Sequence, residues 1–411
     1  MITRRQLLGS GIGLAIASML ERASLADDKK PQGKAKAVIL LWMNGGPSHI
    51  DTWDPKQGKV AGPGKSIKTS VPNVSISEHM PRLAQRASKL AIVRGMTSKE
   101  GNHQRAQYLL RTGYAPNPTV VHPTLAAWVS KRMGEPTTGL PASVSLGGPS
   151  LGGGFFGVQH GPFVVAQPGQ IPQNSSFGPF VDGGRFDARK QLLAGMEERF
   201  ANATGDAKVE GRRALYDKAD RLMHAAALKA FDASEESASV RAAFGDTPFG
   251  RGCLTASRLV QNGVRFVEVT LDGWDTHQNN FDRTKKLMET LDPAMSALLD
   301  DLERRGLASS TLVAWMGDFG RTPKINGNDG RDHHPAAWSA VLAGAGIRGG
   351  VVHGETDADG AKVVKDAVTV PNLLATIATA LGLDPNDTVM SPVGRPISLT
   401  DDGVPVKALL A

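Results

Sequence analysis

The chain has 411 residues, with 47 Lys or Arg against 40 Asp or Glu, so its formal net charge is +7. Aromatic residues make up only 5% and no block of five like charges occurs, which argues against a nucleic-acid-binding groove, because such a groove needs clustered cations and stacking rings. The single cysteine, Cys253, excludes an intramolecular disulfide, and its amphipathic surroundings favour a role as small core filling.

The N-terminal segment has the features of an export signal. Arg4 and Arg5 form a pair, a short apolar run follows over residues 7–20, and a small-residue site stands at residues 24–26. This order predicts a twin-arginine signal peptide over residues 1–26 and a periplasmic or secreted mature protein. The apolar run is short and rich in Gly for a bilayer of about 30 Å, so we expect no stable membrane span after processing.

Short apolar runs bounded by turn residues predict buried strands, and longer stretches with apolar residues at helical spacing separate them. Strands alternating with helices predict an α/β fold, a doubly wound and mostly parallel sheet with helices on both faces. The predicted strands are residues 37–43, 91–93, 264–271, 311–316 and 340–343, and the predicted helices are residues 80–90, 279–305 and 371–381.

The domain organisation follows from changes in composition. We expect residues 27–36 to form a flexible leader and residues 37–411 to form a single domain. Residues 141–184 carry many Gly and Pro residues, which predicts an irregular excursion or a small lid. Residues 186–244 are charged, Ala-rich and helix-like, so we expect them to lie outside the sheet, and residues 141–244 together form an insertion or lid.

Polar clusters stand directly after the predicted strands, at residues 44–54, 97–108, 272–280 and 317–335. In a parallel sheet these positions share the carboxyl edge, where ligands bind. Carboxylates and neutral imidazoles are ligands of zinc, manganese and related metals. One His–Asp pair in a Gly-rich loop is more often a turn held by local hydrogen bonds. Four clusters at one edge favour a shared metal site.

These motifs, in this order, resemble the exported family known as domain of unknown function 1501. The resemblance covers nearly the whole mature chain. That family is similar to the alkaline-phosphatase and sulfatase superfamily, which implies an alkaline-phosphatase-like sheet, one or two divalent metal ions and hydrolysis of phosphate or sulfate esters. The matching motifs are GGPSHIDTWD at 45–54, HQRA at 103–106, TGY at 112–114, GWDTH at 273–277, GDFGRTPK at 317–324 and GRDH at 330–333.

The resemblance implies a set of metal ligands. Asn44 stands where the superfamily has its first metal-binding Asp, and Asp318 is followed by Phe319 where the superfamily has an Asp-His pair. The expected ion is zinc, manganese or calcium, because Asp and His ligand sets accept several ions. The candidate metal ligands are Asn44, Asp51, Asp275, His277, Asp318, His333 and His334.

The motifs define the catalytic candidates less sharply than the metal ligands. The superfamily's nucleophile position falls near Gly101, which has no side chain, so Thr97 or Ser98 is the substitute if catalysis is covalent. His49 is a candidate for proton transfer, and His103 is a further candidate in the second polar cluster.

Three functional hypotheses remain open at this point. The first is an exported metal-dependent hydrolase that acts on a small anionic ester or a sulfated glycan and grips the anion with Arg105 or Arg321. The second is a catalytically degenerate binding protein for carbohydrate or cell-envelope ligands, which Asn44 and Gly101 favour. The third is a structural partner in an exported complex.

Overall fold

A continuous apolar run forms the central strand, β1 (Ala37–Asn44), whose first seven residues are all buried. Burial without alternation is the pattern of a strand covered on both faces. The computed structural model describes residues 33–178, 180–204 and 208–411, so the predicted signal peptide lies outside the described residues. Residues 33–411 form one compact unit.

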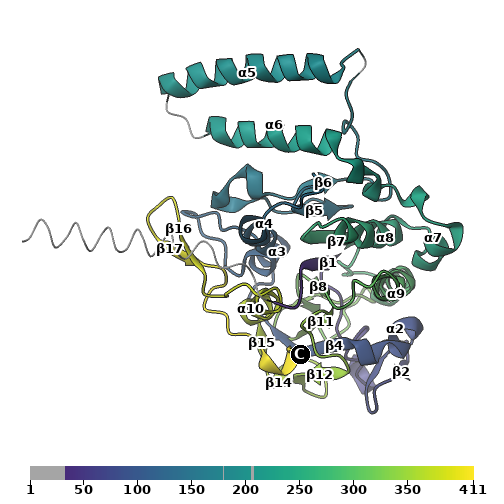
Figure 1. Cartoon of the computed structure of the whole chain (residues 1–411). Helices are drawn as coiled ribbons and strands as arrows, with labels where there is room; N and C mark the ends of the chain where they lie inside the picture. The colour runs from purple at the N-terminus through teal and green to yellow at the C-terminus, as the bar shows by residue number, and fades with distance from the viewer. Residues whose placement is uncertain (1–32, 179, 205–207) are drawn as a thin grey trace, which may run out of the picture. The chain divides into compact units, whose positions relative to one another are not determined.

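The central sheet is mixed but mostly parallel, as the sequence predicts (Figure 1). β1 lies between β7 and β8 and runs parallel to both. The strand order is β12 (Val351–His353), β4 (Leu90–Thr97), β11 (Trp338–Gly344), β8 (Thr311–Gly317), β1, β7 (Phe266–Asp272), β5 (Ser143–Leu146) and β6 (Phe163–Val165), and β15 (Val368–Thr369) also pairs with β4.

One strand runs against the others. β11 is antiparallel to both β8 and β4, so its first residue, Trp338, lies at the carboxyl edge of its neighbours. The chain therefore enters β11 at the edge where β1, β4, β7 and β8 end. This direction brings the polar segment before β11 to the same edge as the segments that follow the parallel strands.

Helices cover both faces of the sheet, and the side chains of β1 alternate between two cores. Ile39 and Leu41 belong to the core that includes residues of α2 (Pro81–Gln85), α8 (Pro248–Gln261) and α9 (Asn280–Arg304). Leu40 and Trp42 belong to the opposite core, which includes residues of α3 (His103–Thr112), α4 (Leu125–Met133) and α10 (Val370–Ala380). The fold is therefore a doubly wound α/β fold.

The middle of the chain differs from our expectation of an irregular excursion. Within it, β5 and β6 extend the central sheet, and both strands run parallel to their neighbours. β5 has four residues and β6 has three, and Gly-rich segments flank both strands. Neither strand therefore has the long apolar run from which the other strands were predicted. The helices that follow are α5 (Gly183–Thr204), α6 (Lys208–His224) and α7 (Ala238–Phe244). No helix among the described residues is long and apolar enough to cross a bilayer.

In the described part of the chain, four small antiparallel pairs of strands lie outside the central sheet. They are β2 (Ser66–Lys68) with β3 (Ser75–Ser77), β9 (Gly320–Arg321) with β10 (His333–His334), β13 (Glu355–Thr356) with β14 (Val363–Lys365), and β16 (Thr388–Met390) with β17 (Pro396–Ser398). The β9–β10 pair matters most for the site, because it connects β8 to β11 at the carboxyl edge.

Candidate metal centre

The carboxyl ends of three neighbouring strands are level with one another. Asn44 of β1 pairs with Asp272 of β7, and Met43 pairs with Gly317 of β8. The segments that leave this edge carry Asp275, His277 and Asp318, while α3 begins at His103 shortly after β4. The β10 strand brings His333 to the same place before the chain enters β11.

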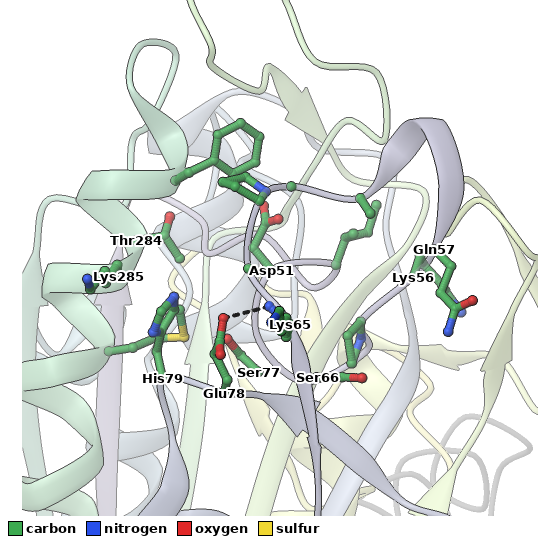
Figure 2. A pocket seen from close by; sticks show the side chains of 18 of the residues that line it. Asp51, Lys56, Gln57, Lys65, Ser66, Ser77, Glu78, His79, Thr284 and Lys285 are labelled. Atoms are coloured by element: carbon green, nitrogen blue, oxygen red, sulfur yellow. Dashed lines mark hydrogen bonds between the residues drawn. The ribbon is translucent and has the colours of Figure 1, made fainter.

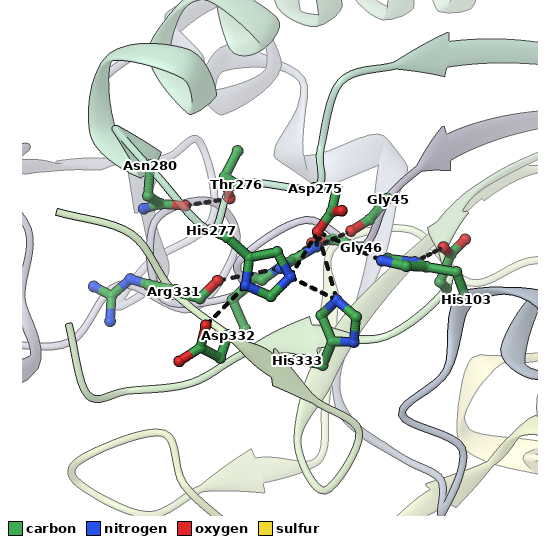
Figure 3. Close-up of polar contacts among 12 residues, drawn as sticks. Gly45, Gly46, His103, Asp275, Thr276, His277, Asn280, Arg331, Asp332 and His333 are labelled. Atoms are coloured by element: carbon green, nitrogen blue, oxygen red, sulfur yellow. Dashed lines mark hydrogen bonds and ion pairs between the residues drawn. The ribbon is translucent and has the colours of Figure 1, made fainter. Parts of the chain in front are cut away.

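Three imidazoles converge on one carboxylate oxygen (Figure 3). The Nε2 atoms of His277, His103 and His333 lie 3.1, 3.4 and 3.5 Å from Oδ1 of Asp275. The Nε2 atoms of His277 and His333 are only 2.9 Å apart. Ligand atoms of His103, Asp275 and His333 all lie within 4.8 Å of one another, close enough to bind one ion.

The opposite nitrogen of each ring is held by an acceptor. Nδ1 of His103 lies 2.6 Å from Oδ2 of Asp318, and Nδ1 of His277 lies 2.8 Å from Oδ1 of Asp332. Nδ1 of His333 lies 2.7 Å from the carbonyl oxygen of Gly101. Because these oxygens only accept, each neutral ring carries its proton on Nδ1 and directs the Nε2 lone pair at Asp275.

Without a cation between them, the converging nitrogen and oxygen atoms repel one another. Nε2 of His103 is buried and has no hydrogen-bond partner among the described residues. Two lone pairs 2.9 Å apart repel each other, and so do lone pairs beside a carboxylate oxygen. A divalent cation removes that repulsion. Histidines that bind such an ion usually donate the N–H of their other ring nitrogen to a carboxylate or a backbone carbonyl, as these three do. The ligand atoms of His103, Asp275 and His333 therefore fit one metal ion, and Nε2 of His277 lies beside them, 2.9 Å from His333.

The protonation states suit metal binding. Burial lowers the pKa of His333, which keeps that ring neutral near pH 7. Burial acts to raise the pKa of Asp275, but the hydrogen bond and the charge of Arg321 outweigh burial and lower the pKa overall. Neutral imidazole and ionised carboxylate are the forms that ligate a metal.

The two arginines expected to grip an anion are both engaged with protein groups. The guanidinium of Arg321 is fully buried and donates to Asp275 at 2.6 Å, to the Gly46 carbonyl at 2.9 Å and also to the Gly45 carbonyl. Arg105 is exposed and forms a bidentate pair with Glu100. Arg321 therefore positions the Asp275 carboxylate, and the structure does not bring Arg105 into the cluster.

Two predicted ligands lie behind His103 rather than among the converging atoms. Asp318 is fully buried, and its Oδ2 contacts His103 while its Oδ1 has no hydrogen-bond partner among the described residues. Asn44 donates to Asp272 at 2.6 Å and accepts from Gln107 at 2.8 Å. Asp318 thus orients a ligand, and Asn44 belongs to the hydrogen-bond network beneath it.

Three further candidates lie apart from the cluster. Asp51 forms an ion pair with Arg331 at 2.7 Å. The rings of His49 and His334 are stacked, and their Nε2 atoms lie 2.8 and 2.9 Å from the adjacent carbonyls of residues 360 and 361. His333 and His334 point to opposite sides because they are consecutive residues of a strand.

Neither hydroxyl candidate is hydrogen-bonded to the cluster in the described part of the chain. Thr97 ends β4, and the Ser98 hydroxyl is buried without a hydrogen-bond partner among the described residues. The sequence analysis placed His103 among the catalytic candidates, and the structure brings its Nε2 to the cluster around Asp275. It also missed Asp332, although its position directly before His333 in the GRDHH motif was a usable signal.

Comparison with known proteins gives a family and several similar folds. No curated protein matches the chain in sequence. Similar solved structures include the PsFucS1 sulfatase from Pseudoalteromonas sp., with 14% identity, a TM-score of 0.41 and coverage of 89% of this chain and 70% of that one. A protein of the alkaline phosphatase superfamily from Vibrio parahaemolyticus has 12% identity, a TM-score of 0.39 and coverage of 87% and 70%. The lipoteichoic acid synthase LtaP from Listeria monocytogenes has 8% identity, a TM-score of 0.41 and coverage of 89% and 79%. The chain belongs to the family described as "Protein of unknown function (DUF1501)", whose model matches residues 35–410.

Proposed function

We propose that this member of the DUF1501 family is an exported metal-dependent hydrolase of sulfate or phosphate esters. Its ion is held by His103, Asp275, His277 and His333. The observation that carries the proposal is the convergence of three Nε2 atoms on Asp275, with each ring fixed through Nδ1.

The donor set narrows the choice of metal. Three imidazole nitrogens and one carboxylate oxygen suit zinc or manganese. Calcium takes six to eight oxygen ligands, and the cluster offers one carboxylate. Zinc and manganese are therefore the ions to test first.

The protein's own groups prepare the centre for ester hydrolysis. A divalent ion bound there acts as a Lewis acid that polarises an ester oxygen and neutralises developing negative charge. Asp318 and Asp332 fix the rings of His103 and His277 and raise their basicity. Arg321 holds Asp275, whose side chain is 48% exposed, so the centre is open to a substrate from solvent.

The proposed attacking group is a water molecule rather than a protein hydroxyl. Ser98 is the stronger of the two hydroxyl candidates because its oxygen is unpaired, but that oxygen is buried. No hydrogen bond joins Thr97 or Ser98 to the four metal-binding residues in the described part of the chain. We therefore propose direct hydrolysis without a covalent intermediate on the protein.

The test compares metal-loaded wild-type protein with Asp275→Ala on aryl sulfates and aryl phosphates. The proposal predicts turnover in the wild type, and loss of both turnover and bound metal in the variant. A metal-loaded wild type that is inert on all these esters refutes the hydrolase and leaves the binding protein. The glycine at position 101 favours that second candidate.

Export is a separate part of the proposal and rests on the sequence of residues 1–26. Replacing Arg4 and Arg5 with Lys removes the twin-arginine pair and is expected to retain the precursor in the cytoplasm. Fractionation of cells that produce each form measures this. Equal amounts of both forms outside the cytoplasm contradict twin-arginine export.

A further inference from the structure

The long helix α5 exposes large apolar side chains along one side. Leu192, Met196 and Phe200 are 66%, 56% and 53% exposed, and they follow one another at intervals of four residues. This interval places them on one side of an α-helix, and we call these three residues the apolar stripe of α5. Exposed helices normally direct polar side chains to solvent, so a row of large apolar groups marks a surface that binds a partner.

Another face of α5 packs on α6 (Figure 1). Lys190 forms an ion pair with Asp220 of α6 at 2.5 Å. The buried Glu197 forms an ion pair with Arg212 of α6 at 2.8 Å. Leu193, which lies between these two residues in the sequence, is half-buried. Residues 190, 193 and 197 have the spacing of one helix face, so α6 covers this face and leaves the apolar stripe exposed.

Three exposed arginines border the apolar stripe. Arg185 and Arg189 precede Leu192 by seven and three residues. Arg199 follows Met196 by three residues. These separations put all three arginines on the side of the helix that carries the stripe. None of the three forms an ion pair in the part of the chain that the structure describes, and the hydrogen bonds of the Arg185 and Arg199 side chains go to backbone carbonyls.

The carboxylates of α5 do not balance these charges. Asp187 stands five residues before the first member of the stripe, and Glu198 stands two residues after the second member. Both therefore lie on the opposite side of the helix. Glu197 faces α6. Asp182 precedes the helix, and its Oδ1 accepts the backbone N–H of Arg185 at 2.8 Å. The side of α5 with the apolar stripe thus carries three arginines against one carboxylate at its start.

The cavity of about 630 Å³ beside the start of α9 has no such imbalance (Figure 2). Its lining holds three lysines and three carboxylates, which are Lys56, Lys65, Lys285, Asp51, Glu78 and Asp282. Because these charges are equal in number, they select no class of ligand. The stripe of α5, and not this cavity, is therefore the surface whose chemistry specifies a partner.

Charge distinguishes a lipid surface from a second copy of the chain as that partner. Two stripes packed antiparallel about a twofold axis place Leu192 of each copy opposite Met196 of the other. The same register places Arg189 opposite Arg199, and facing like charges weaken such a pairing. An anionic phospholipid surface meets the same features favourably, because its phosphate groups bind guanidinium groups and its acyl chains accept apolar side chains.

An exposed aromatic residue extends this surface at the start of the helix. Phe180 is 92% exposed, and its carbonyl accepts from the guanidinium of Arg185 at 2.9 Å. Aromatic rings and arginines both suit the boundary between lipid head groups and acyl chains, because each has an apolar part and a polar part.

We propose that α5 binds the surface of a bilayer that contains anionic phospholipid. The helix lies along the membrane, with the apolar stripe at the edge of the acyl chains and with Arg185, Arg189 and Arg199 on lipid phosphates. Binding here requires no metal ion and no turnover, so this proposal stands or fails independently of the hydrolase.

Sedimentation of the mature protein, residues 27–411, with lipid vesicles tests the partner. One set of vesicles is phosphatidylcholine alone, and the other contains about one third phosphatidylglycerol. We expect at least about tenfold tighter binding to the anionic vesicles, and weaker binding when the salt concentration rises from about 0.1 M to about 0.5 M. Equal binding to both kinds of vesicle, or binding to neither, overturns the proposal.

Variants then place the binding on α5. Leu192→Ser combined with Met196→Ser removes two apolar groups and is expected to weaken binding to anionic vesicles at least about tenfold. Arg189→Gln combined with Arg199→Gln is expected to remove most of the preference for anionic over neutral vesicles. Circular dichroism and thermal unfolding of each variant establish that it is folded.

The matched control is Met390→Ser combined with Val404→Ser, two apolar residues outside α5 that are each 64% exposed. This control is expected to bind vesicles like the wild type. Unchanged binding in a folded variant with serine at positions 192 and 196 overturns the assignment to α5. Light scattering covers the alternative, because a dimer that these two substitutions dissociate, without vesicle binding, makes the stripe an interface between two copies and also overturns the proposal.

Discussion

At the scale of single residues, the candidate centre depends on groups that orient the ligands as much as on the ligands themselves. Each of the three rings has an acceptor on Nδ1, so its Nε2 lone pair is committed to one direction. The resemblance to the alkaline-phosphatase and sulfatase superfamily implied Asp318 as a ligand, because Asp318 stands where that superfamily has a metal-binding Asp-His pair. In the structure its Oδ2 contacts Nδ1 of His103, so we propose that it acts through that ring.

Asp318→Asn tests this positioning role. The substitution keeps the size of the side chain but removes the negative charge from the partner of His103 Nδ1. We expect metal affinity to fall about 10- to 100-fold, as for other second-layer partners of metal-binding histidines. Competitive zinc titration measures this, with the exposed Asp246→Asn as the matched control. Unchanged affinity in a folded Asp318→Asn protein would show that the carboxylate does not act on the metal.

His49 makes stability depend on pH. Burial lowers the pKa of His49 from 6.5 to about 4, so between these values the unfolded chain binds a proton that the folded protein does not. Stability therefore falls as pH falls, by about 2 kcal/mol between pH 7 and pH 5.

We expect His49→Gln, which can still donate to the Gly360 carbonyl, to lose this part of the pH dependence. Urea unfolding at pH 7 and pH 5 measures it, and the exposed His224→Gln is the control. The same pH dependence in the wild type and in His49→Gln contradicts the assignment.

At the scale of elements, sequence patterns predicted long and regular segments well. The apolar run of β1 and the helical spacing of α9 mark both elements within one residue of their observed bounds. The direction of β11 was not predictable, because an apolar run reads alike in a parallel and an antiparallel strand. The choice between His333 and His334 was also open, because the sequence does not show which side of β10 faces the cluster.

The loop before β10 packs against the segment that carries Asp275 and His277, and this contact can be tested. A Cβ on Gly330 falls 1.9 Å from the carbonyl oxygen of His277, so Gly330→Ala forces the two loops apart. We expect metal affinity to drop at least about tenfold while the sheet stays folded.

Gly327 lies in the same loop and a Cβ there meets nothing within 4 Å, so Gly327→Ala is the control. Metal titration together with circular dichroism compares the two variants. Equal metal affinity in both would mean that the approach of Gly330 does not position His277.

At the scale of the whole molecule, the centre joins segments from both halves of the chain. His103 begins α3, Asp275 and His277 follow β7, and His333 precedes β11, so an ion bound by all four stabilises only the folded state. A free ion concentration of 100 times Kd adds about 2.7 kcal/mol to the free energy of unfolding.

We therefore expect saturating zinc or manganese to raise the Tm of the wild type by a few degrees and a chelator to reverse the rise. Asp275→Ala is expected to show neither response. Scanning calorimetry measures both proteins. A wild type whose Tm is the same with metal and with chelator would contradict a site that spans these segments.

Elemental analysis of the mature protein after native export, beside Asp275→Ala and His334→Ala, tests most directly whether the cluster binds a metal ion. The two variants are matched, because His334 is the neighbour of a proposed ligand but its Nε2 contacts the Ala361 carbonyl. We expect stoichiometric zinc or manganese in the wild type and in His334→Ala, and loss of that metal in Asp275→Ala. A wild type without metal after incubation with both ions, or an Asp275→Ala protein with full metal content, would contradict it.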